Sequence, residues 1–249
     1  RLKPITISTY MRMLRGIYNR GVDMHQAPYV HGLFRDVFTG VDTRQKKAIP
    51  ISELHMLLNK DPQSEKLRRT QAIANLLFQF CGMPFSDLAH LEKSNLERGL
   101  LKYNRTKTGT PMSIEVLESA QNAIGGLYNK SDARSSGYPD YLFRILSGAY
   151  KRNEEGAYRE YQSALRRFNN ELKSLSRKLR LHSPVTSYTL RHSWATTAKY
   201  RGVPIEMISE SLGHKSIKTT QIYLKGFELE ERTKVNKSNY SYVCNFKML

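Results

Sequence analysis

The stretch that decides the fold reads Val185-Thr-Ser-Tyr-Thr-Leu-Arg191-His-Ser-Trp-Ala-Thr-Thr-Ala198 and then, beyond Gly202, Leu212-Gly-His214-Lys-Ser-Ile-Lys-Thr-Thr-Gln-Ile-Tyr223. The apolar and small side chains around Arg191 predict a helix whose arginine lies against a buried face. Gly213 ends a helix, so His214 follows directly on its C-terminus. An arginine, a histidine and a tyrosine nine residues after the histidine form a pattern that indicates a catalytic site.

The composition indicates a globular protein with an anionic partner. The chain has 249 residues, 39% hydrophobic and 10% aromatic, which is enough for one large or two modest domains with real cores. Forty Lys and Arg oppose 22 Asp and Glu, giving a net charge of +18 and a pI near 9.9. So large an excess of positive charge favours nucleic acid as the binding partner. A membrane surface is the alternative anionic partner. No uncharged apolar run approaches the ~18 residues of a spanning helix, so we expect no membrane partner.

The sequence gives no sign of a disulfide framework or a metal site. Cys81 and Cys244 lie far apart, which indicates a reducing cytosol. Motifs such as Cys-x-x-Cys are absent, and Asp87 is better interpreted as supporting the start of its helix than as a magnesium ligand. We therefore expect neither a metal nor another cofactor, and a cytoplasmic localisation. The chain starts at Arg1 inside a helical pattern, so we expect a fragment of a longer protein.

The arginine, the Leu-Gly-His and the tyrosine resemble the second catalytic box of the tyrosine recombinases, the phage-integrase family. The resemblance covers about residues 1–227. It implies that Tyr223 attacks a DNA phosphate while Arg191 and His214 hold the charge that develops. Arg191 suits this role because its planar fork can grip a phosphate through two donors. The resemblance also implies a mainly α fold with a small antiparallel β-sheet (α+β), arranged as a two-domain clamp around the duplex.

A hairpin is predicted from Leu100 to Val116, with one strand over 100–107, a turn at Thr108-Gly-Thr110 and a return strand over 112–116. The resemblance places the family's general-acid lysine at Lys107. Arg105 precedes it by two residues, so on a strand the two side chains share a face and both reach one phosphate.

Two positions depart from the family pattern. Gly82-Met-Pro-Phe-Ser-Asp-Leu88 stands where Gly-Leu-Arg-x-Ser-Glu-Leu is usual, so the first-box arginine has become Pro84. Tyr188, one helical turn before Arg191, replaces the usual histidine. The Met-Pro-Phe box is similar to that of a branch of mobile-element integrases and DNA invertases. We expect an active enzyme in which Arg105 replaces the missing guanidinium and Tyr188 keeps a hydroxyl at the site.

The chain is expected to divide into four parts. Residues 1–39 resemble the last part of a helical core-binding, DNA-binding domain, and residues 40–48 are a polar interdomain linker. Residues 49–235 form the catalytic domain, and residues 236–249 an apolar tail, which the resemblance implies packs on a neighbouring protomer. The basic residues expected to contact DNA are Arg12, Arg15, Arg44, Lys46, Lys47, Lys215 and Lys218.

Apolar periodicity predicts a helix over 157–180. Helices are also expected over 66–81, which is apolar, over 115–128, and over the charged residues 225–237. Residues 131–156 are expected to be irregular. Thr6 or Ser8 is expected to cap the first helix, and Ser52 the helix that opens the catalytic domain.

The resemblance implies a site-specific DNA recombinase, an integrase or invertase. Tyr223 forms a 3′-phosphotyrosine, strands exchange through a Holliday junction, and the DNA is rejoined. The ester preserves the bond energy, so neither ATP nor a metal is required. Double-stranded DNA with paired recombination sites implies a DNA-bound tetramer. We further expect an accessory DNA-bending protein and association with a bacterial nucleoid.

Two other functions are open from the residues. Pro84 and Tyr188 support a catalytically silent relative that only binds and bridges DNA. Such a binder has no chemical need to retain Tyr223, His214 and Arg191. An enzyme similar to a type IB topoisomerase shares the chemistry, but the Leu-Gly-His box and the linker pattern favour a recombinase.

Overall fold

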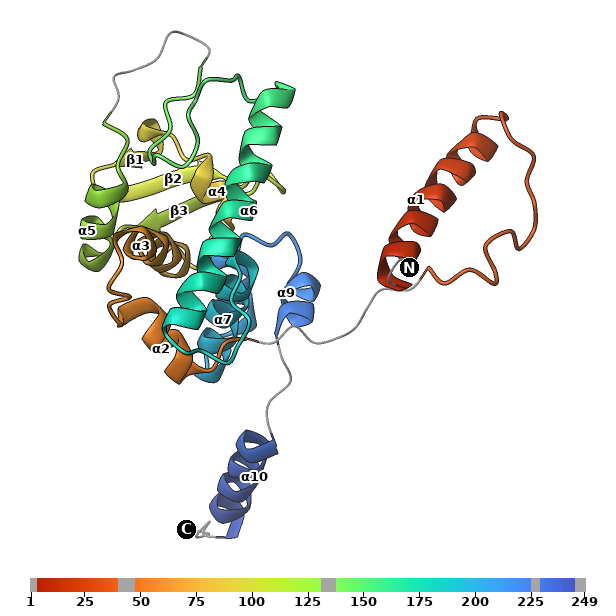
Figure 1. The fold of residues 1–249 in the computed structure, drawn as a ribbon. Coiled ribbons are helices and arrows are strands. Elements are labelled where there is room, and N and C mark those ends of the chain that lie inside the picture. The colour runs from red at the N-terminus through yellow and green to blue at the C-terminus, as the bar shows by residue number, and fades with distance from the viewer. Residues whose placement is uncertain (1–3, 40–47, 131–137, 225–228, 245–249) are drawn as a thin grey trace. The chain divides into compact units, whose positions relative to one another are not determined.

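The computed structural model describes residues 4–39, 48–130, 138–224 and 229–244 (Figure 1). The chain forms two compact units, Arg1–Gln45 and Lys46–Leu249. Their boundary falls within the expected linker over 40–48, nearly all of which lies outside the described residues. The boundary expected between 235 and 236 falls inside a helix, α10 (Leu229–Cys244).

The first unit contains one long helix, α1 (Pro4–Asp23), followed by turns up to residue 39. The Tyr18 hydroxyl donates to the Pro28 carbonyl and accepts from the Val30 N–H, both at 2.7 Å, which fastens the returning chain to the helix. The predicted caps are wrong. Pro4 occupies the first position, which suits its fixed φ, so Thr6 and Ser8 lie inside the helix.

The second unit is mainly helical with one antiparallel sheet, as the sequence predicts. Its first half contains α2 (Ile51–Asn59), α3 (Glu65–Gln79), α4 (Phe85–Ala89), the 3-10 turn η1 (Lys93–Asn95), β1 (Leu96–Glu97), β2 (Leu100–Asn104), β3 (Pro111–Glu115) and α5 (Glu118–Leu127). Its second half contains α6 (Glu155–Lys178), α7 (Ser187–Tyr200), α8 (Ile205–Ser211), α9 (Ile217–Tyr223) and α10. The N-cap of α2 is Pro50 without a side-chain bond, so the prediction of a Ser52 cap is wrong.

The sheet has the order β1-β2-β3, with Leu101 opposite both Leu96 and Ile114. Leu101 and Ile114 are buried while their neighbours along each strand are more exposed, which is the alternation of a sheet with one covered face. The short strand β1 was not predicted, because two residues carry no readable period. The hairpin is present as predicted, but its first strand ends at Asn104, before Arg105, and its return strand runs one residue earlier than predicted, over Pro111–Glu115.

The core is centred on α3, which packs against α2, α5, α6 and α7. Leu76 and Leu77 of α3 are fully buried. Figure 1 shows α6 running along the side of the unit that faces the viewer. The ring of Phe168 on α6 stacks on Phe85 at 4.7 Å and 11°. This contact anchors α4, and with it the segment from Pro84 to Asp87, to the core.

Residues 138–154 are irregular, as predicted, but they contribute to the core. Tyr141, Leu142 and Phe143 are almost fully buried. The Leu142 N–H donates to the Leu91 carbonyl at 2.7 Å, and its carbonyl accepts from Asn129 N–H at 2.9 Å. A smaller cluster of Ala195, Ile208 and Leu212 joins α7 to α8, on which α9 packs.

Candidate active site

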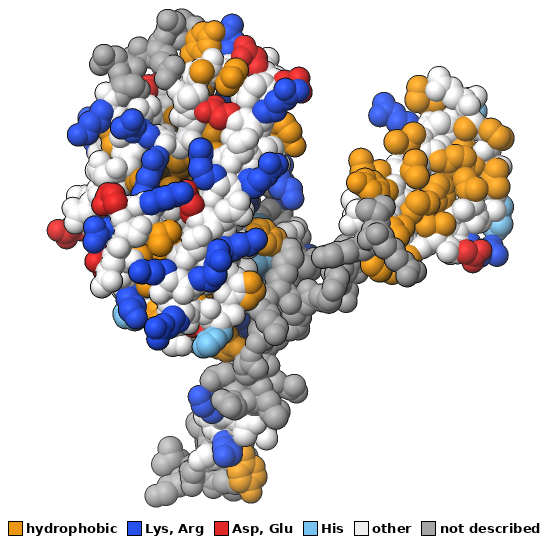
Figure 2. Space-filling view, in the orientation of Figure 1, with side chains coloured by type: hydrophobic (Ala, Val, Ile, Leu, Met, Phe, Trp, Pro, Cys, Tyr) orange, Lys and Arg blue, Asp and Glu red, His pale blue; other side chains and the backbone are white. Residues whose placement is uncertain are grey.

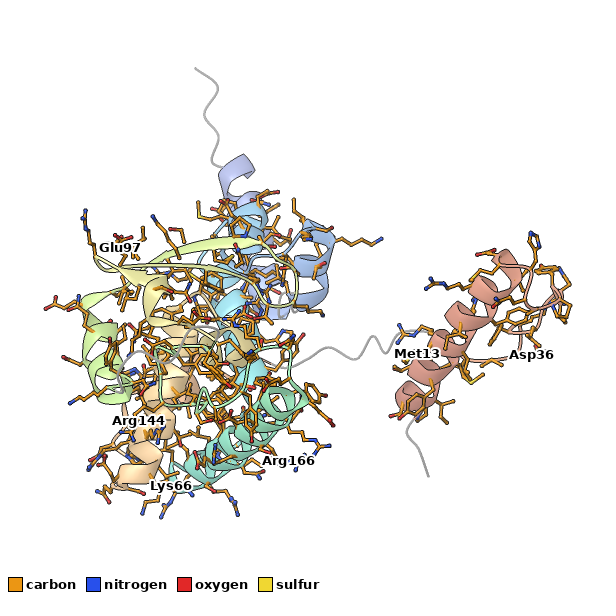
Figure 3. All side chains as sticks on the ribbon, turned by 90° about the horizontal axis from the view of Figure 1, so that it is seen from above. Met13, Asp36, Lys66, Glu97, Arg144 and Arg166 are labelled. Atoms are coloured by element: carbon orange, nitrogen blue, oxygen red, sulfur yellow. The ribbon has the colours of Figure 1, made fainter. Side chains whose placement is uncertain are left out.

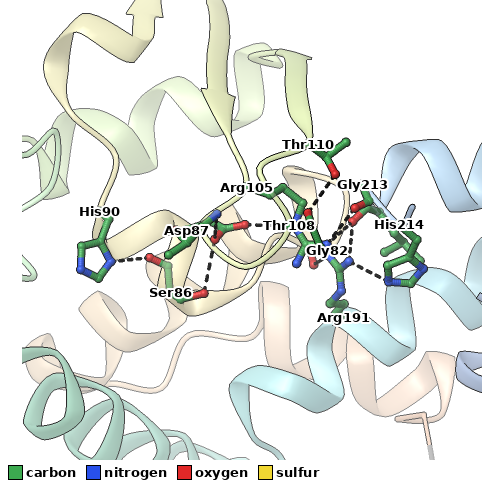
Figure 4. Close-up of polar contacts among 12 residues, drawn as sticks. Gly82, Ser86, Asp87, His90, Arg105, Thr108, Thr110, Arg191, Gly213 and His214 are labelled. Carbon is green, nitrogen blue, oxygen red and sulfur yellow. Dashed lines mark hydrogen bonds and ion pairs between the residues drawn. The ribbon is translucent and has the colours of Figure 1, made fainter. Parts of the chain in front are cut away.

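Arg191 lies in the second turn of α7 and is only 3% exposed. The helix starts at a capping box, in which Thr186 Oγ1 accepts from the Thr189 N–H and the Thr189 side chain accepts from the Thr186 N–H. Arg191 Nη1 donates to the Gly82 carbonyl at 2.8 Å, and Nη2 donates to the Leu212 carbonyl (Figure 4). The guanidinium therefore joins the α3–α4 connection to the end of α8.

Gly82 allows this approach. Its φ is +65°, and an added Cβ would lie 3.2 Å from Arg191 Cα. An L side chain rarely adopts such a backbone conformation, so glycine is required here for both reasons. Two residues later, Pro84 stands where the family pattern has its first-box arginine, and it occupies the N-cap of α4.

His214 follows Gly213, whose φ of +63° ends α8. His214 Nε2 lies 3.1 Å from Arg191 Nη2, and Nδ1 lies 2.8 Å from the Thr220 hydroxyl oxygen. A guanidinium only donates, so Nε2 must accept and the ring proton must be on Nδ1, which donates to Thr220. The imidazole is therefore neutral. Consistent with this, burial, followed by the charges of Arg191, Arg105 and Lys107, lowers the pKa of His214 to about 4.

Arg105 lies in the loop that follows β2, and it is only 7% exposed. Its Nε donates to Asp87 Oδ2 at 3.2 Å, and its Nη1 donates to the carbonyls of Leu212 at 2.8 Å and Gly213 at 3.2 Å. The guanidinium groups of Arg105 and Arg191 thus meet at one carbonyl oxygen, that of Leu212.

The predicted strand face shared by Arg105 and Lys107 is wrong. The Arg105 N–H donates to the Thr110 carbonyl and its carbonyl accepts from Gly109, so the chain turns at this point. The turn directs Arg105 inward and leaves Lys107 exposed. Lys107 is nevertheless close enough to His214 for its charge to lower the pKa of the imidazole.

Asp87 belongs to the same cluster, which the sequence did not indicate. It does lie in the first turn of α4, as interpreted, but its side chain is only 1% exposed. One carboxylate oxygen accepts from Arg105, and the other accepts from the Thr106 N–H at 3.2 Å. It therefore holds both the guanidinium and the hairpin loop. The sequence showed an acidic residue within the stretch that resembles the first recombinase box, but nothing in it indicated that Arg105 would be the partner.

Tyr188 is 41% exposed, and its ring meets that of His192 edge-on at 4.6 Å. A hollow of about 460 Å³ beside Arg191 is lined by Pro84, Phe85, Ser86, Tyr161, Leu165, Asn169, Thr186, Ser187, Tyr188 and Arg191. Both departures from the family pattern, Pro84 and Tyr188, thus border one hollow next to the buried arginine. His192 is 2% exposed and belongs to the core side of α7.

Tyr223 is the last residue of α9, and its side chain lies outside the described part of the structure. Thr220, one turn earlier, is fully buried and bonded to His214, so the backbone of this helix is held against the cluster. Lys215 and Lys218 are exposed and flank the start of α9. Arg12 and Arg15 are exposed on α1 of the first unit, whereas Arg44, Lys46 and Lys47 are outside the described residues.

Basic side chains also gather away from this cluster. Figure 2 shows Lys and Arg spread over the face of the second unit that α6 crosses, and Lys66, Arg144 and Arg166 lie along one side in Figure 3. A hollow of about 350 Å³ there is bordered by Lys66, Arg69, Arg144 and Arg167. Three elements supply these cations, so only the fold brings them together.

Within the part of the chain that the structure describes, no group of three or more His, Cys, Asp or Glu could hold a metal ion. The described helices include none that is long and apolar enough to cross a membrane.

The phage integrase family matches residues 48–229 of the chain. Among curated proteins, the chain is 30% identical to tyrosine recombinase XerD of Halalkalibacterium halodurans over 190 residues, which are 72% of this chain and 57% of that protein. It is 28% identical to the probable integrase/recombinase protein MJ0367 of Methanocaldococcus jannaschii, over 79% of this chain and 58% of that protein. The chain thus spans under three-fifths of the length of these relatives.

Two solved structures share the fold. The XerA recombinase crystal structure matches with a TM-score of 0.55 and 20% identity, over 100% of this chain and 86% of that chain. The Tn1549 transposon integrase, solved in complex with transposon right end DNA, matches with a TM-score of 0.59 and 15% identity, over 96% of this chain and 80% of that chain.

Proposed function

Because the chain belongs to the phage integrase family, the tyrosine recombinases, we propose that it is a site-specific DNA recombinase that acts through a 3′-phosphotyrosine intermediate. The observation that carries the proposal is the junction at the Leu212 carbonyl. Two guanidinium groups meet there, a neutral imidazole lies 3.1 Å from one of them, and the helix that ends at Tyr223 is bonded to that imidazole.

The proposed reaction needs a nucleophile, donors to the non-bridging oxygens and an acid for the leaving group. The Tyr223 oxygen forms a bond to phosphorus as the bond to the 5′ oxygen breaks. The tyrosine proton passes to water, and the 5′ oxygen takes a proton from Lys107. Arg191 and His214 donate to the phosphate. The reverse attack by a 5′ hydroxyl rejoins the strand and releases the tyrosine, so the sequence of steps balances without ATP.

We assign the second guanidinium of the site to Arg105. Pro84 cannot donate, whereas Arg105 reaches the same carbonyl as Arg191 from the hairpin side. Asp87 neutralises the Nε edge of Arg105, and the fixed plane of the guanidinium presents its Nη groups toward the junction. Tyr188, exposed at the hollow beside Arg191, supplies a hydroxyl that can donate a hydrogen bond.

The partner proposed from the net charge is double-stranded DNA with paired sites, bound by a tetramer of the chain in the bacterial nucleoid, with a DNA-bending accessory protein. Lys215 and Lys218 flank the cluster and are assigned to phosphate contacts that position the duplex. The exposed Arg12 and Arg15 of the first unit have the same assignment, and so do Arg44, Lys46 and Lys47.

The test is covalent trapping on a pool of duplexes with random sequence around a central 5′-bridging phosphorothiolate, whose cleaved thiol does not rejoin. Wild type is expected to form a denaturant-stable adduct, and Tyr223→Phe none. Tyr158→Phe, which changes a 64% exposed tyrosine of α6, is the matched control and is expected to react as wild type. DNA binding without an adduct would support the silent binder. Relaxation of plasmids lacking a recovered site would support the topoisomerase.

A further inference from the structure

Thr220 is the one described side chain of α9 that is buried, and its hydroxyl lies 2.8 Å from His214 Nδ1. The other described side chains of this seven-residue helix are exposed, and Ser216 caps its start. The backbone of α9 ends at Tyr223 three residues after Thr220. Among the side chains of α9 that the structure describes, Thr220 therefore supplies the hydrogen bond to the arginine–histidine cluster.

The direction of the hydrogen bonds follows from what each group can donate. Arg191 can only donate, which makes His214 Nε2 an acceptor and leaves the proton on Nδ1. Thr220 then accepts from Nδ1–H. A phosphate oxygen placed beside Arg191 reverses the requirement, because a phosphate only accepts and His214 must donate to it from Nε2.

Two changes can supply that donor. His214 can gain a proton at Nε2, in which case Thr220 still accepts from Nδ1–H. Alternatively, Nδ1 loses its proton to solvent and Nε2 gains one, in which case Thr220 donates to Nδ1. A hydroxyl serves in both arrangements by rotating about its C–O bond, whereas a carbonyl or a carboxylate could serve only in the first.

Among the described residues, the charged groups that lower the pKa of His214 come from two elements. Arg191 approaches from α7, and Arg105 and Lys107 approach from the hairpin loop. All three groups are cationic. The Asp87 carboxylate is bonded to Nε of Arg105, whereas Nη1 of Arg105 reaches the Leu212 carbonyl. A second proton on the imidazole is therefore disfavoured until an anion enters the cluster.

We propose that Thr220 is a positioning residue that holds His214 as the neutral Nδ1–H form in the DNA-free chain, and that its rotatable hydroxyl lets His214 become an Nε2 donor when a DNA phosphate arrives. This inference rests on the proposed recombinase function for its second half only. The first half concerns the free protein. The same contact ties the helix of the nucleophile to the group that binds the phosphate, so both are placed together.

The first measurement is the ¹⁵N spectrum of the histidine side chains in the full 249-residue chain without DNA. Wild type is expected to show His214 as the Nδ1–H tautomer. The His214 signals are assigned as those that disappear in His214→Gln. Thr220→Val keeps the shape but removes the hydroxyl, and should give a mixture of tautomers. Thr220→Ser should restore the wild-type pattern. Thr219→Val, on the exposed side of α9, is the control and should change nothing.

The second measurement is the rate of adduct formation on a duplex recovered from the trapping pool. Thr220→Val is expected to react at least about tenfold more slowly, since hydrogen bonds to groups that become charged are worth more than neutral ones. Thr220→Ser should stay within about threefold of wild type on the same reasoning. Circular dichroism melting separates an unfolded variant from a mispositioned histidine, and the serine variant tests the idea if the valine variant does not fold.

An Nε2–H tautomer in wild-type free protein, or an unchanged tautomer in Thr220→Val, would overturn the proposal. An equal adduct rate in Thr220→Val and Thr219→Val would do the same for its second half. If the tautomers behave as expected but wild type forms no adduct, the positioning of His214 stands and the proposed recombinase function fails.

Discussion

The contact between Arg105 and Asp87 gives the sharpest test of the site, because it separates stability from catalysis. The two side chains are 7% and 1% exposed, and their ion pair is 3.2 Å long. Arg105→Ala removes this pair and both hydrogen bonds to the carbonyls of Leu212 and Gly213. It leaves the Asp87 carboxylate buried with two neutral donors, the Thr106 N–H at 3.2 Å and the Ser86 hydroxyl at 3.3 Å, and without its cationic partner.

Removing one partner of a buried pair typically costs about 3–5 kcal/mol, most of it from the charge left behind. For a unit of this size, that loss lowers Tm by about 6–20 °C. Arg68→Ala is the matched control. The Arg68–Asp61 pair has a similar N–O distance of 3.0 Å, but its side chains are 52% and 58% exposed. We expect no measurable loss of stability in that variant.

The double variant Arg105→Met, Asp87→Leu then separates the role of Arg105 in DNA cleavage from its role in stability. Replacing a buried pair by apolar side chains is often neutral. The Thr106 N–H, the half-buried Ser86 hydroxyl and the Gly213 carbonyl each lose one neutral hydrogen bond, so the double variant should recover to within about 2 kcal/mol of wild type. The Leu212 carbonyl still accepts from Arg191. We expect the double variant to fold and bind DNA but to form no phosphotyrosine adduct.

Urea denaturation gives the stability of each variant, and the trapping assay gives its adduct yield per folded molecule. If the double variant folds and cleaves at the wild-type rate, Arg105 is only a structural residue and its assignment as the second guanidinium is wrong. If Arg105→Ala is as stable as Arg68→Ala, the argument from burial itself is refuted.

Three further predictions use the same assays. Lys107→Ala should lose cleavage of an ordinary phosphodiester but regain it with a 5′-bridging phosphorothiolate, whose leaving group needs no acid; Lys102→Ala, exposed on β2, should behave as wild type, and a failure of rescue would remove Lys107 as the acid. Gly213→Ala should reduce adduct formation as much as Arg105→Ala, because the added Cβ would lie 2.4 Å from Arg105 Cδ at a φ of +63°; full activity would show that the guanidinium position is unimportant. The pKa of His214 is about 4 in the folded chain and 6.5 ordinarily, so the unfolded chain binds more protons between these values and stability should fall as pH drops from 6.5 to 4; an equal fall in His214→Gln, measured by urea midpoints, would contradict this.

Local patterns in the sequence were sufficient to predict several features of the site. The period of apolar residues on α6 and the small residues around Arg191 indicated which faces are buried, and the structure confirms both. Gly213 marked the end of α8 because a positive φ favours glycine. Each of these signals acts over one or two turns of chain. The assignment of Tyr223 as nucleophile came from the family pattern and stays a prediction, since its side chain is outside the described residues.

Other features of the site depended on which distant groups meet. Arg105 was expected on a strand beside Lys107, but the strand ends at Asn104 and the arginine turns inward to Asp87 and to carbonyls more than 100 residues away. Neither spacing nor propensity encodes the position of a backbone carbonyl such as that of Leu212. The sequence by itself thus determined the family, the helices α3, α5, α6 and α7, and the arginines and histidine of the site, but not Asp87. Only tertiary packing decided that two arginines and a histidine converge there, because a buried charge takes whichever partners the folded backbone places within reach.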